Sequence, residues 1–388
     1  ASKTSRLQPA NMPGGVMESL LRLLTWPIRR TNQLLFDIFS PSLLRLGVWI
    51  FESNLLPDFV ARFGMRQMIA TNLIPKNIEE QRAEFMSYVE SLKKCPVAMN
   101  TADANDQHYE LPPDFFYPIM GERLKYSCCL FPDEINVDDI DTAETLALQQ
   151  VCSRAEIVDG LTILELGCGW GSLSLWMAEH YPKCKVYSVS NSNAQRDVIM
   201  GRAKLRGITN LEVETCDMNV FKPPAGRTFD RVVSIEMFEH MKNYQTLFSR
   251  CTEWLKPGGK MFIHIFCHKL LAYNFETEGD INWMGKYFFT GGTMPADHLF
   301  LYFCHPLKLV GHWAVNGVHY SKTLEVWMRR MDKNMKIINP ILDSVYGRSN
   351  RTLWTARWRG FFMACSELFA YNGGNEWYVS HYLFEKPA

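Results

Sequence analysis

One short segment restricts the fold of this chain more than any other. Residues 161–166 form an apolar run that reads as a buried strand, and the glycine-rich sequence 167–171 (Gly-Cys-Gly-Trp-Gly) follows at once. A helical pattern then runs from Ser172 to His180. Glycines at alternate positions allow a tight turn and let a ligand approach the backbone closely. The segment therefore predicts a strand, a ligand-binding turn and a helix, the first unit of a βαβ fold.

The sequence that follows alternates between short apolar runs and helical stretches. Further strands are predicted at Lys185–Val189, Leu211–Glu214, Arg231–Ile235, Lys260–His264 and Trp377–Phe384, and helices at Asn193–Leu205, 323–338 and 351–369. Such alternation is typical of βαβ units, whose parallel sheet is covered by helices. The predicted fold class is thus α/β, with an aromatic-rich, partly helical insertion at about 270–370 before the last strands.

Composition excludes several classes of protein. The chain of 388 residues has 41 Lys+Arg and 41 Asp+Glu, and this zero net charge disfavours a nucleic-acid-binding protein. The 11 cysteines include no C-x-x-C pair, so we expect no metal site. Scattered thiols in a chain of this size favour a reducing compartment, and we expect a cytoplasmic protein.

The spacing of the glycines distinguishes between two cofactors. Dinucleotide-binding folds use G-x-G-x-x-G, whereas this chain has G-x-G-x-G, with Glu165 two residues before Gly167. This variant is typical of S-adenosylmethionine (SAM) methyltransferases, because SAM has no pyrophosphate and its amino-acid moiety lies over the loop instead. We therefore expect a SAM-dependent methyltransferase, with S-adenosylhomocysteine (SAH) as its product. Resemblance to such enzymes implies a Rossmann-like class I fold with a mostly parallel seven-stranded sheet.

Residues beyond the next two strands are candidates for the rest of the cofactor, because ligands of such folds bind at the carboxyl ends of the strands. The second strand lacks the usual ribose-binding acid, so Ser190, Asn191 or Gln195 would donate to the ribose hydroxyls. The third strand is followed by Asp217, which we expect to meet the adenine amino group. The simpler interpretation of Asp217 is the cap of a turn.

Three titratable residues follow the fourth strand, where the reacting methyl group would be exposed. Glu236, Glu239 and His240 are spaced i, i+3, i+4, so one helical turn would put them on one face. Two carboxylates beside an imidazole can hold an amine and accept a proton. Alternatively, one Glu caps a helix and the other is solvated. We favour the catalytic interpretation.

The N-terminal region has a different texture. Residues 1–15 are predicted to be a flexible lead-in, 16–84 a helical extension, 85–150 a helical lid over the cofactor, and 151–388 the catalytic domain. Residues 1–76 contain nine Lys or Arg and four acids. A basic amphipathic region can lie on an anionic membrane surface; the alternative is a helical cap packed on the main domain. No uncharged apolar run of 18 residues is present, so we expect no spanning helix.

A series of ordered motifs gives the chain a specific resemblance. They are His108-Tyr109-Glu110, Tyr126-Ser127-Cys128-Cys129, the loop 167–171, Glu236–Tyr244, Phe266–Lys269, Tyr287–Pro295, His312-Trp313 and Tyr371–Trp377. Through these motifs, residues 85–387 resemble the cyclopropane-fatty-acid-synthase superfamily of SAM-dependent methyltransferases. Within it, the chain is most similar to the coclaurine N-methyltransferase-like branch.

The resemblance implies roles for matching residues. Tyr109, Tyr126 and Ser127 would close over the amino-acid end of SAM, and Gly167 and Gly169 would form the loop. The remaining matches are the ribose contact and the catalytic cluster of the N-methyltransferases, namely Gln195, Glu236, Glu239 and His240.

The same resemblance leaves a second chemistry open. The cyclopropane synthases use a bicarbonate base, whose ligands match Cys128, Glu239, His264 and Tyr320 here. The position of Glu236 separates the two, because the lipid enzymes usually carry Gly there. An added carboxylate suits a cationic substrate and would sit badly against an acyl chain.

Aromatic residues of the insertion are candidates for the substrate pocket. Tyr287, Phe288 and Trp313 belong to this group, and some such rings could hold a cation by the π-face. The pocket candidates from the bicarbonate set are Cys128, His264 and Tyr320. Ordinary core packing is the alternative for each aromatic residue.

These observations predict N-methylation of a small, alkaloid-like secondary or tertiary amine, with His240 as base, Glu239 orienting it and Glu236 anchoring the nitrogen. One alternative is methyl or methylene transfer to unsaturated phospholipid acyl chains. Bicarbonate would then be the base, and the basic N-terminal helices would dock on an anionic membrane. Another is a non-catalytic SAM-binding protein, which the intact loop and cluster disfavour. A small-molecule amine is the expected partner, nucleic acid is not, and peripheral membrane contact and a homodimer are left open.

Overall fold

The computed structural model describes residues 41–71, 73, 77–99, 111–279 and 282–388. Three predictions fall outside these residues: the whole lead-in 1–15, much of the extension 16–84, and the cofactor candidate Tyr109. The predicted boundary between residues 84 and 85 falls inside a continuous helix, α4 (Ile78–Leu92).

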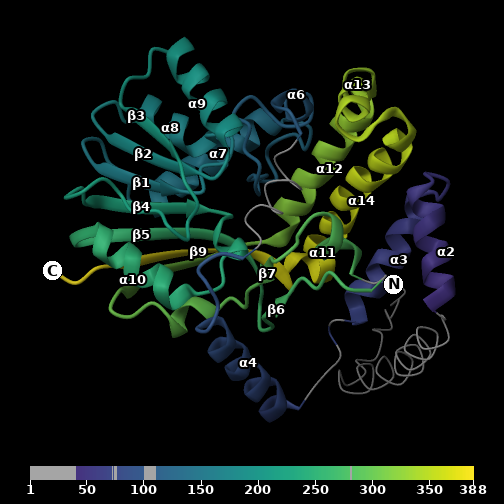
Figure 1. The fold of residues 1–388 in the computed structure, drawn as a ribbon, viewed down its shortest axis with the longest axis horizontal. Coiled ribbons are helices and arrows are strands. Elements are labelled where there is room, and N and C mark those ends of the chain that lie inside the picture. Colours follow the sequence, from purple (N-terminus) through teal and green to yellow (C-terminus); the bar gives the residue numbers. More distant parts are fainter. Residues whose placement is uncertain (1–40, 72, 74–76, 100–110, 280–281) are drawn as a thin grey trace, which may run out of the picture.

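A seven-stranded sheet forms the centre of the described chain (Figure 1). Its strands are β1 (Thr162–Leu166), β2 (Lys185–Ser190), β3 (Leu211–Thr215), β4 (Phe229–Ile235), β5 (Leu255–His268), β8 (Lys308–Val315) and β9 (Trp377–Glu385). They lie in the order β3-β2-β1-β4-β5-β9-β8, and β9 runs antiparallel to both of its neighbours. The predicted α/β class with a mostly parallel seven-stranded sheet is confirmed.

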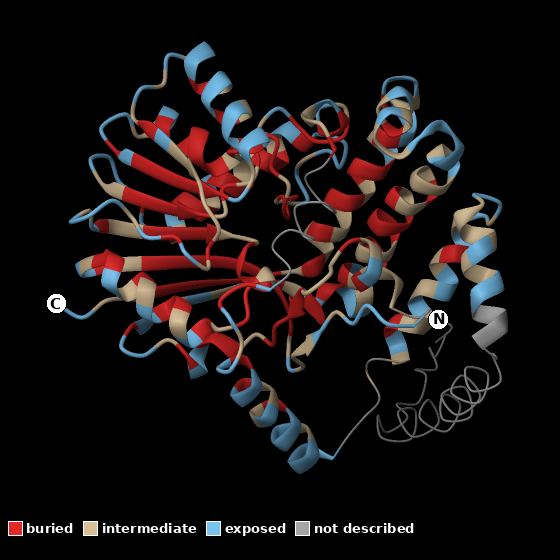
Figure 2. Ribbon diagram, viewed as in Figure 1, coloured by how far each residue is buried: buried red, intermediate tan, exposed pale blue. Residues whose placement is uncertain are grey.

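Helices cover both faces of the sheet, as the alternation of side chains along the strands requires. On one face, Ile163 of β1 packs with α7 (Ile140–Arg154), α8 (Ser172–His180) and α9 (Asn193–Leu205). On the other face, Leu164 and Leu166 pack with α4 and α10 (Tyr244–Trp254). Strands β1, β2, β5 and β9 are accordingly buried along most of their length (Figure 2).

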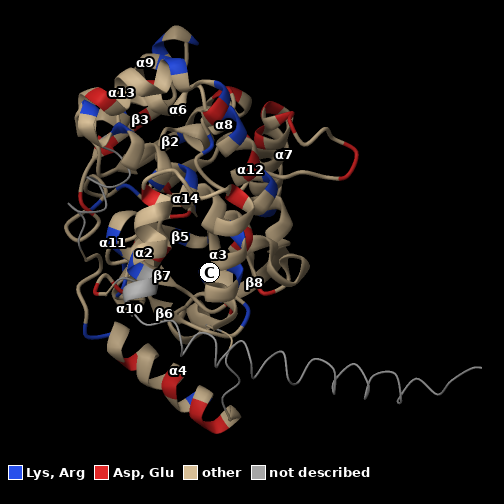
Figure 3. Ribbon diagram, turned by 90° about the vertical axis from the view of Figure 1, so that its right-hand side faces the viewer, with Lys and Arg blue, Asp and Glu red and all other residues tan. Residues whose placement is uncertain are grey.

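The insertion builds a second core beside the sheet. It contains the short strands β6 (Tyr273–Asn274) and β7 (Thr293–Met294) and the helices α11 (Trp283–Tyr287), α12 (Gly317–Lys333), α13 (Met335–Tyr346) and α14 (Arg351–Ala370). Their aromatic side chains pack with α6 (Pro113–Phe116) and with Trp170 of the glycine loop 167–171. The insertion thus lies against this loop. Figure 3 shows both charge signs interspersed over these helices, in keeping with the zero net charge.

Strand β8 is the one strand of the central sheet, as described, that the sequence pattern did not predict. It forms the sheet edge, and most of its residues are exposed or half-buried. An edge strand of this kind lacks the continuous apolar run that marked β1. The periodicity therefore gave no strand signal at Lys308–Val315.

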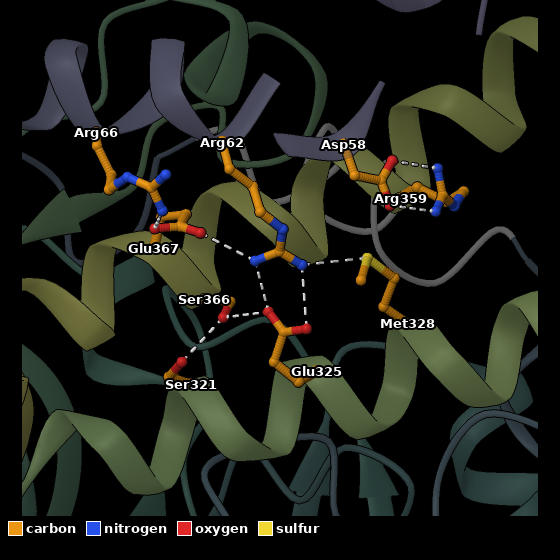
Figure 4. Close-up of polar contacts among 9 residues, drawn as sticks. All are labelled: Asp58, Arg62, Arg66, Ser321, Glu325, Met328, Arg359, Ser366 and Glu367. Atoms are coloured by element: carbon orange, nitrogen blue, oxygen red, sulfur yellow. Dashed lines mark hydrogen bonds and ion pairs between the residues drawn. The ribbon is translucent and has the colours of Figure 1, made fainter. Parts of the chain in front are cut away.

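Helices α2 (Pro41–Glu52) and α3 (Asp58–Thr71) lie beside α14, on the side away from the sheet (Figure 1). The polar residues of α3 point inward (Figure 4). Arg62 donates to Glu325 of α12 at 2.7 and 3.0 Å and to Glu367 of α14 at 3.0 Å. Arg66 donates to Glu367 at 2.8 Å. Helix α3 is therefore held as a cap on the insertion.

The opposite face of these helices is apolar and open to solvent. Phe59 is 73% exposed and Phe63 60%, and Trp49 of α2 is 61% exposed. Helix α3 is therefore not a simple amphipathic helix: apolar Ala61 and Ile69 are buried beside the inward arginines, while Phe59 and Phe63 face solvent. Among the described helices, none has both the length and the apolar character needed to cross a membrane.

This arrangement predicts unequal effects for the two inward arginines. Arg62 has a side chain only 19% exposed, so Arg62→Met should lower the free energy of unfolding by about 1–3 kcal/mol, because charged hydrogen bonds to two helices are lost. Arg66, with a side chain 48% exposed and one such contact, serves as the control, and Arg66→Met should cost less than about 1 kcal/mol. Urea unfolding measures both values. Equal losses of stability for the two variants would contradict the larger role given to Arg62 in holding α3 on the insertion.

Candidate active site

The glycine loop leaves room beside β1 for a ligand. Gly169 has a φ of 50°, in the left-handed region, and a Cβ built there would meet no atom of the described residues within 4 Å. At Gly171, by contrast, a Cβ would lie 2.5 Å from Ile199 of α9. Gly169 thus borders open space, whereas the lack of a side chain at Gly171 permits α9 to pack closely. An open turn at the start of α8, with glycines at its positive-φ positions, fits the amino-acid moiety of SAM.

Glu165 turns away from the loop and into the protein. Its Oε2 accepts hydrogen bonds from the hydroxyls of Ser174 and of Ser188, the latter at 3.2 Å. Burial raises the pKa of Glu165 to about 7. The acid of the motif therefore stabilises the joint between β1, β2 and α8.

Of the three ribose candidates, Gln195 offers a donor, and Ser190 holds the side chain of Gln195 in place. Ser190 donates to Oε1 of Gln195 at 2.6 Å and accepts from the backbone N–H of Ser192, so its hydroxyl is engaged within the protein. Gln195 is 1% exposed, and its Nε2 has no partner among the described residues. A buried, unpaired amide N–H suits a ribose hydroxyl. Asn191 is exposed at the end of β2.

Asp217 lies where the sequence placed it, directly after β3. One of its oxygens accepts from the backbone N–H of Asn219 at 2.7 Å, which is the turn-capping interaction weighed above. The turn geometry therefore explains part of the role of Asp217. The adenine contact stays a prediction.

A buried lysine supports the segment that carries Tyr126 and Ser127. Lys125 is 1% exposed, and its Nζ donates to the hydroxyl of Ser127 and to the carbonyl of Cys128, each at 2.6 Å. The ring of Tyr126 stacks on Trp327 of α12. Motif reasoning singled out Tyr126 and Ser127 but missed Lys125, although it directly precedes them.

Glu236 occupies the centre of the candidate site. It follows β4 with a φ of 47°, which is uncommon outside glycine and typical of functional turns. Its carboxylate accepts hydrogen bonds from the hydroxyl of Tyr320 at 2.5 Å and from the backbone N–H of Cys128 at 3.4 Å, and it lies 3.2 Å from Nε2 of His264. Burial raises the pKa of Glu236 to about 7, against the opposing hydrogen bond from Tyr320 and the charge of Lys125.

Glu239 and His240 lie in a 3₁₀ turn, Phe238–His240, and the expected single α-helical face is wrong because Glu236 stands outside this turn with positive φ. Glu239 is 1% exposed, and its Oε2 has no partner among the described residues. Burial, and then the charge of Glu236, raise the pKa of Glu239 well above its ordinary value. The ring of His240 stacks on Phe289 of the insertion.

The predicted aromatic pocket residues have structural partners. Phe288 is fully buried and stacks on Phe361, so it belongs to the core of the insertion. The ring of Tyr287 lies under the guanidinium of Arg357, at 3.8 Å, which occupies its cation-binding face. Trp313 lies on the edge strand β8. These contacts account for part of the position of Tyr287 and Phe288, and a role of Tyr287, Phe288 and Trp313 in the substrate pocket stays a prediction. Cys128, His264 and Tyr320 do converge, on the carboxylate of Glu236.

Comparison with known proteins agrees with this geometry. Residues 98–376 match the family model described as mycolic acid cyclopropane synthetase. The chain belongs to this family. It is 36% identical over 342 residues to (S)-coclaurine N-methyltransferase of Thalictrum flavum subsp. glaucum, covering 86% of this chain and 94% of that protein. It is 30% identical over 226 residues to the cyclopropane-fatty-acyl-phospholipid synthase of Escherichia coli K12, covering 58% of this chain and 55% of that protein.

Among solved structures, the crystal structure of coclaurine N-methyltransferase bound to N-methylheliamine and SAH superposes with a TM-score of 0.83 at 35% sequence identity. The match covers 89% of this chain and 99% of that one. Within the family, this chain is a SAM-dependent methyltransferase. The open loop at Gly169 and the unpaired amide of Gln195 fit its cofactor.

The loop geometry predicts a selective loss of cofactor binding. In Gly169→Ala, the new methyl group fills the open space beside the loop and the left-handed backbone is strained, so affinity for SAH should fall at least about tenfold. Gly201 of α9 also has no neighbour within 4 Å but a helical backbone, so Gly201→Ala should keep the affinity. Calorimetric titration with SAH measures both. Retained affinity in Gly169→Ala would place the cofactor elsewhere.

Proposed function

We propose that this protein N-methylates a small secondary or tertiary amine of the alkaloid-like class. The observation that carries the proposal is a pair of carboxyl groups, Glu236 and Glu239, at the end of β4, with the buried Oε2 of Glu239 lacking a partner among the described residues. An amine nitrogen is a natural partner for such an oxygen. Similarity to coclaurine N-methyltransferase over most of both chains supports the proposal.

The residues of the site solve a problem that amines pose. An amine with a pKa of about 10 is mostly protonated at neutral pH, and a protonated nitrogen has no lone pair to attack with. Glu236 would anchor the ammonium, and His240, oriented by Glu239, would take its proton directly or through water. SAM, when bound, would supply a methyl group on a positively charged sulfur: the nitrogen lone pair would bond to the methyl carbon as the carbon–sulfur bond breaks and SAH leaves. The protein adds orientation and exclusion of water.

The contacts of Glu236 argue against the lipid alternative. Cys128, His264 and Tyr320 match the bicarbonate ligands of the cyclopropane synthases, and here all three lie within hydrogen-bond distance of the carboxylate of Glu236. A side-chain carboxylate thus uses the donors that bicarbonate would need. A second anion beside it would face like-charge repulsion in a buried site.

The finer predictions about partners and location stay predictions. Arg62 and Arg66, two of the nine N-terminal cations, point into the protein and pair with acids there, which weakens the electrostatic case for peripheral membrane contact. The exposed apolar face of α2 and α3 is the surface on which membrane contact or a homodimer would depend. A cytoplasmic location, and residues 85–150 as a lid, are likewise proposed.

The catalytic proposal is tested by SAH release with a panel of secondary and tertiary amines, with phospholipid vesicles assayed in parallel. We expect turnover with amines, and His240→Ala should lower kcat by about 10²–10⁴-fold, because the base is lost. His180 lies exposed on α8, so His180→Ala is the matched control and should keep full activity. Turnover with vesicles alone would favour the lipid reaction, and wild-type turnover by His240→Ala would remove His240 as base.

The pKa of Glu236 predicts the acidic limb of the pH profile. If ionised Glu236 holds the ammonium, kcat/KM should rise as the pH passes through about 7. Tyr320→Phe removes a donor that stabilises the ionised form, so the pKa of Glu236 should rise and the limb should move to higher pH. Initial rates of SAH release from pH 5 to 9 measure the shift. If the acidic limb of Tyr320→Phe stays at the wild-type pH, Glu236 is not the group whose ionisation controls kcat/KM.

A further inference from the structure

A continuous row of hydrogen bonds runs from the carboxylate of Glu236 to a cation on the far side of β5 and β9. Oε1 of Glu236 lies 3.2 Å from Nε2 of His264, whose Nδ1 lies 2.8 Å from Nε2 of His381. Nδ1 of His381 in turn lies 2.8 Å from Nη1 of Arg154, in the last turn of α7. The two histidines are direct cross-strand neighbours on β5 and β9.

The chemistry of arginine gives this row a direction. A guanidinium has only donors, so Nδ1 of His381 must accept from Arg154. His381 then carries its proton on Nε2 and donates to Nδ1 of His264. His264 in turn carries its proton on Nε2 and donates to Glu236. One cation at the end of α7 thus fixes both tautomers.

Burial keeps both imidazoles in the row neutral. His264 is 3% exposed and His381 1%, and desolvation lowers the pKa of each well below the ordinary value. The nearby cations Lys125 and Arg154 lower the two pKa values further. A neutral imidazole has one donor and one acceptor, which is the pattern that the row requires.

Arg154 is placed to serve the row. The aromatic ring of Trp313 lies under its guanidinium at 5.4 Å, and Trp313 is the cross-strand neighbour of His381 on β8. Within the described ranges, Arg154 forms no ion pair with a carboxylate; its hydrogen bond goes to His381. Trp313, expected in the substrate pocket, therefore holds the remote end of the row.

We propose that Arg154 and His381 are positioning residues that hold the proton of His264 on Nε2 and so keep a hydrogen-bond donor aimed at Glu236. The inference rests on the proposed function, because it matters for catalysis only if ionised Glu236 binds the amine. Neither residue touches the reacting atoms. Both act on Glu236 through His264.

Loss of the cation should reverse the preference for the ionised carboxylate. Without Arg154, both histidines can adopt the opposite tautomers, and Nε2 of His264 would then accept a hydrogen bond from the protonated, neutral carboxyl group of Glu236. The other groups that influence Glu236 stay in place in such a variant. They are Lys125, Cys128, Glu239, Tyr320 and Cys365. A shift in titration would therefore report on the row.

The tautomers can be read directly by ¹⁵N NMR of histidine-labelled protein, assigned with His264→Gln and His381→Gln. In the wild type, both rings should show the neutral form protonated at Nε2. In Arg154→Met this form should give way to a mixture, whereas Arg154→Lys, which also only donates, should restore it. If wild-type His264 carries its proton on Nδ1, the proposal is wrong, and this result needs no variant to fold.

The pH profile of kcat/KM gives the functional readout. Arg154→Met should move the acidic limb to higher pH by about one unit, the effect of losing one hydrogen bond to a charged group, and Arg154→Lys should move it back. Arg231→Met is the matched control, because Arg231 donates to the carbonyls of Ala155 and Glu156 at the same helix end without contact to His381. Its limb should not move.

The two readouts separate the inference from the proposed function. If no amine is methylated but the Nε2 tautomers are present and depend on Arg154, the row stands and the amine reaction falls. If amines are methylated and Arg154→Met leaves the limb and the tautomers unchanged, the positioning role is wrong.

Discussion

The carboxylate of Glu236 is the group on which the rest of the site depends. Three elements from distant parts of the chain send a donor to it: the segment before α7, strand β5 and helix α12. Each donor comes from a buried residue, so the charge is removed from water but not left without partners. The cofactor half of the molecule and the insertion are therefore joined at the point where chemistry is proposed to occur.

The sheet could be predicted because its central strands are buried on both faces and read as short apolar runs between turns. Strand β8 could not, since an edge strand with mostly exposed or half-buried residues carries no such run. The loop 167–171 and the cluster after β4 were identifiable from motifs, because glycine spacing and clustered titratable residues report local chemistry.

The contacts between those residues were not predictable in the same way. The spacing of Glu236, Glu239 and His240 suggested one helical face, but the positive φ of Glu236 turns its side chain toward β5 and α12 instead. Lys125 and His381 also escaped notice, since each acquires meaning only from a neighbour distant in sequence or from burial. Aromatic composition could not distinguish a pocket wall from the stacked core around Phe288.

The inward ion pairs of α3 have a consequence for the autonomy of the methyltransferase core. Glu325 and Glu367 obtain much of their neutralising charge from Arg62 and Arg66, residues that lie in the N-terminal extension and outside the sheet. A chain shortened to begin after α3 would leave two adjacent acids on α12 and α14 facing each other without those cations. Helix α12 also carries Tyr320, so the N-terminal extension and the carboxylate of Glu236 both contact the same helix.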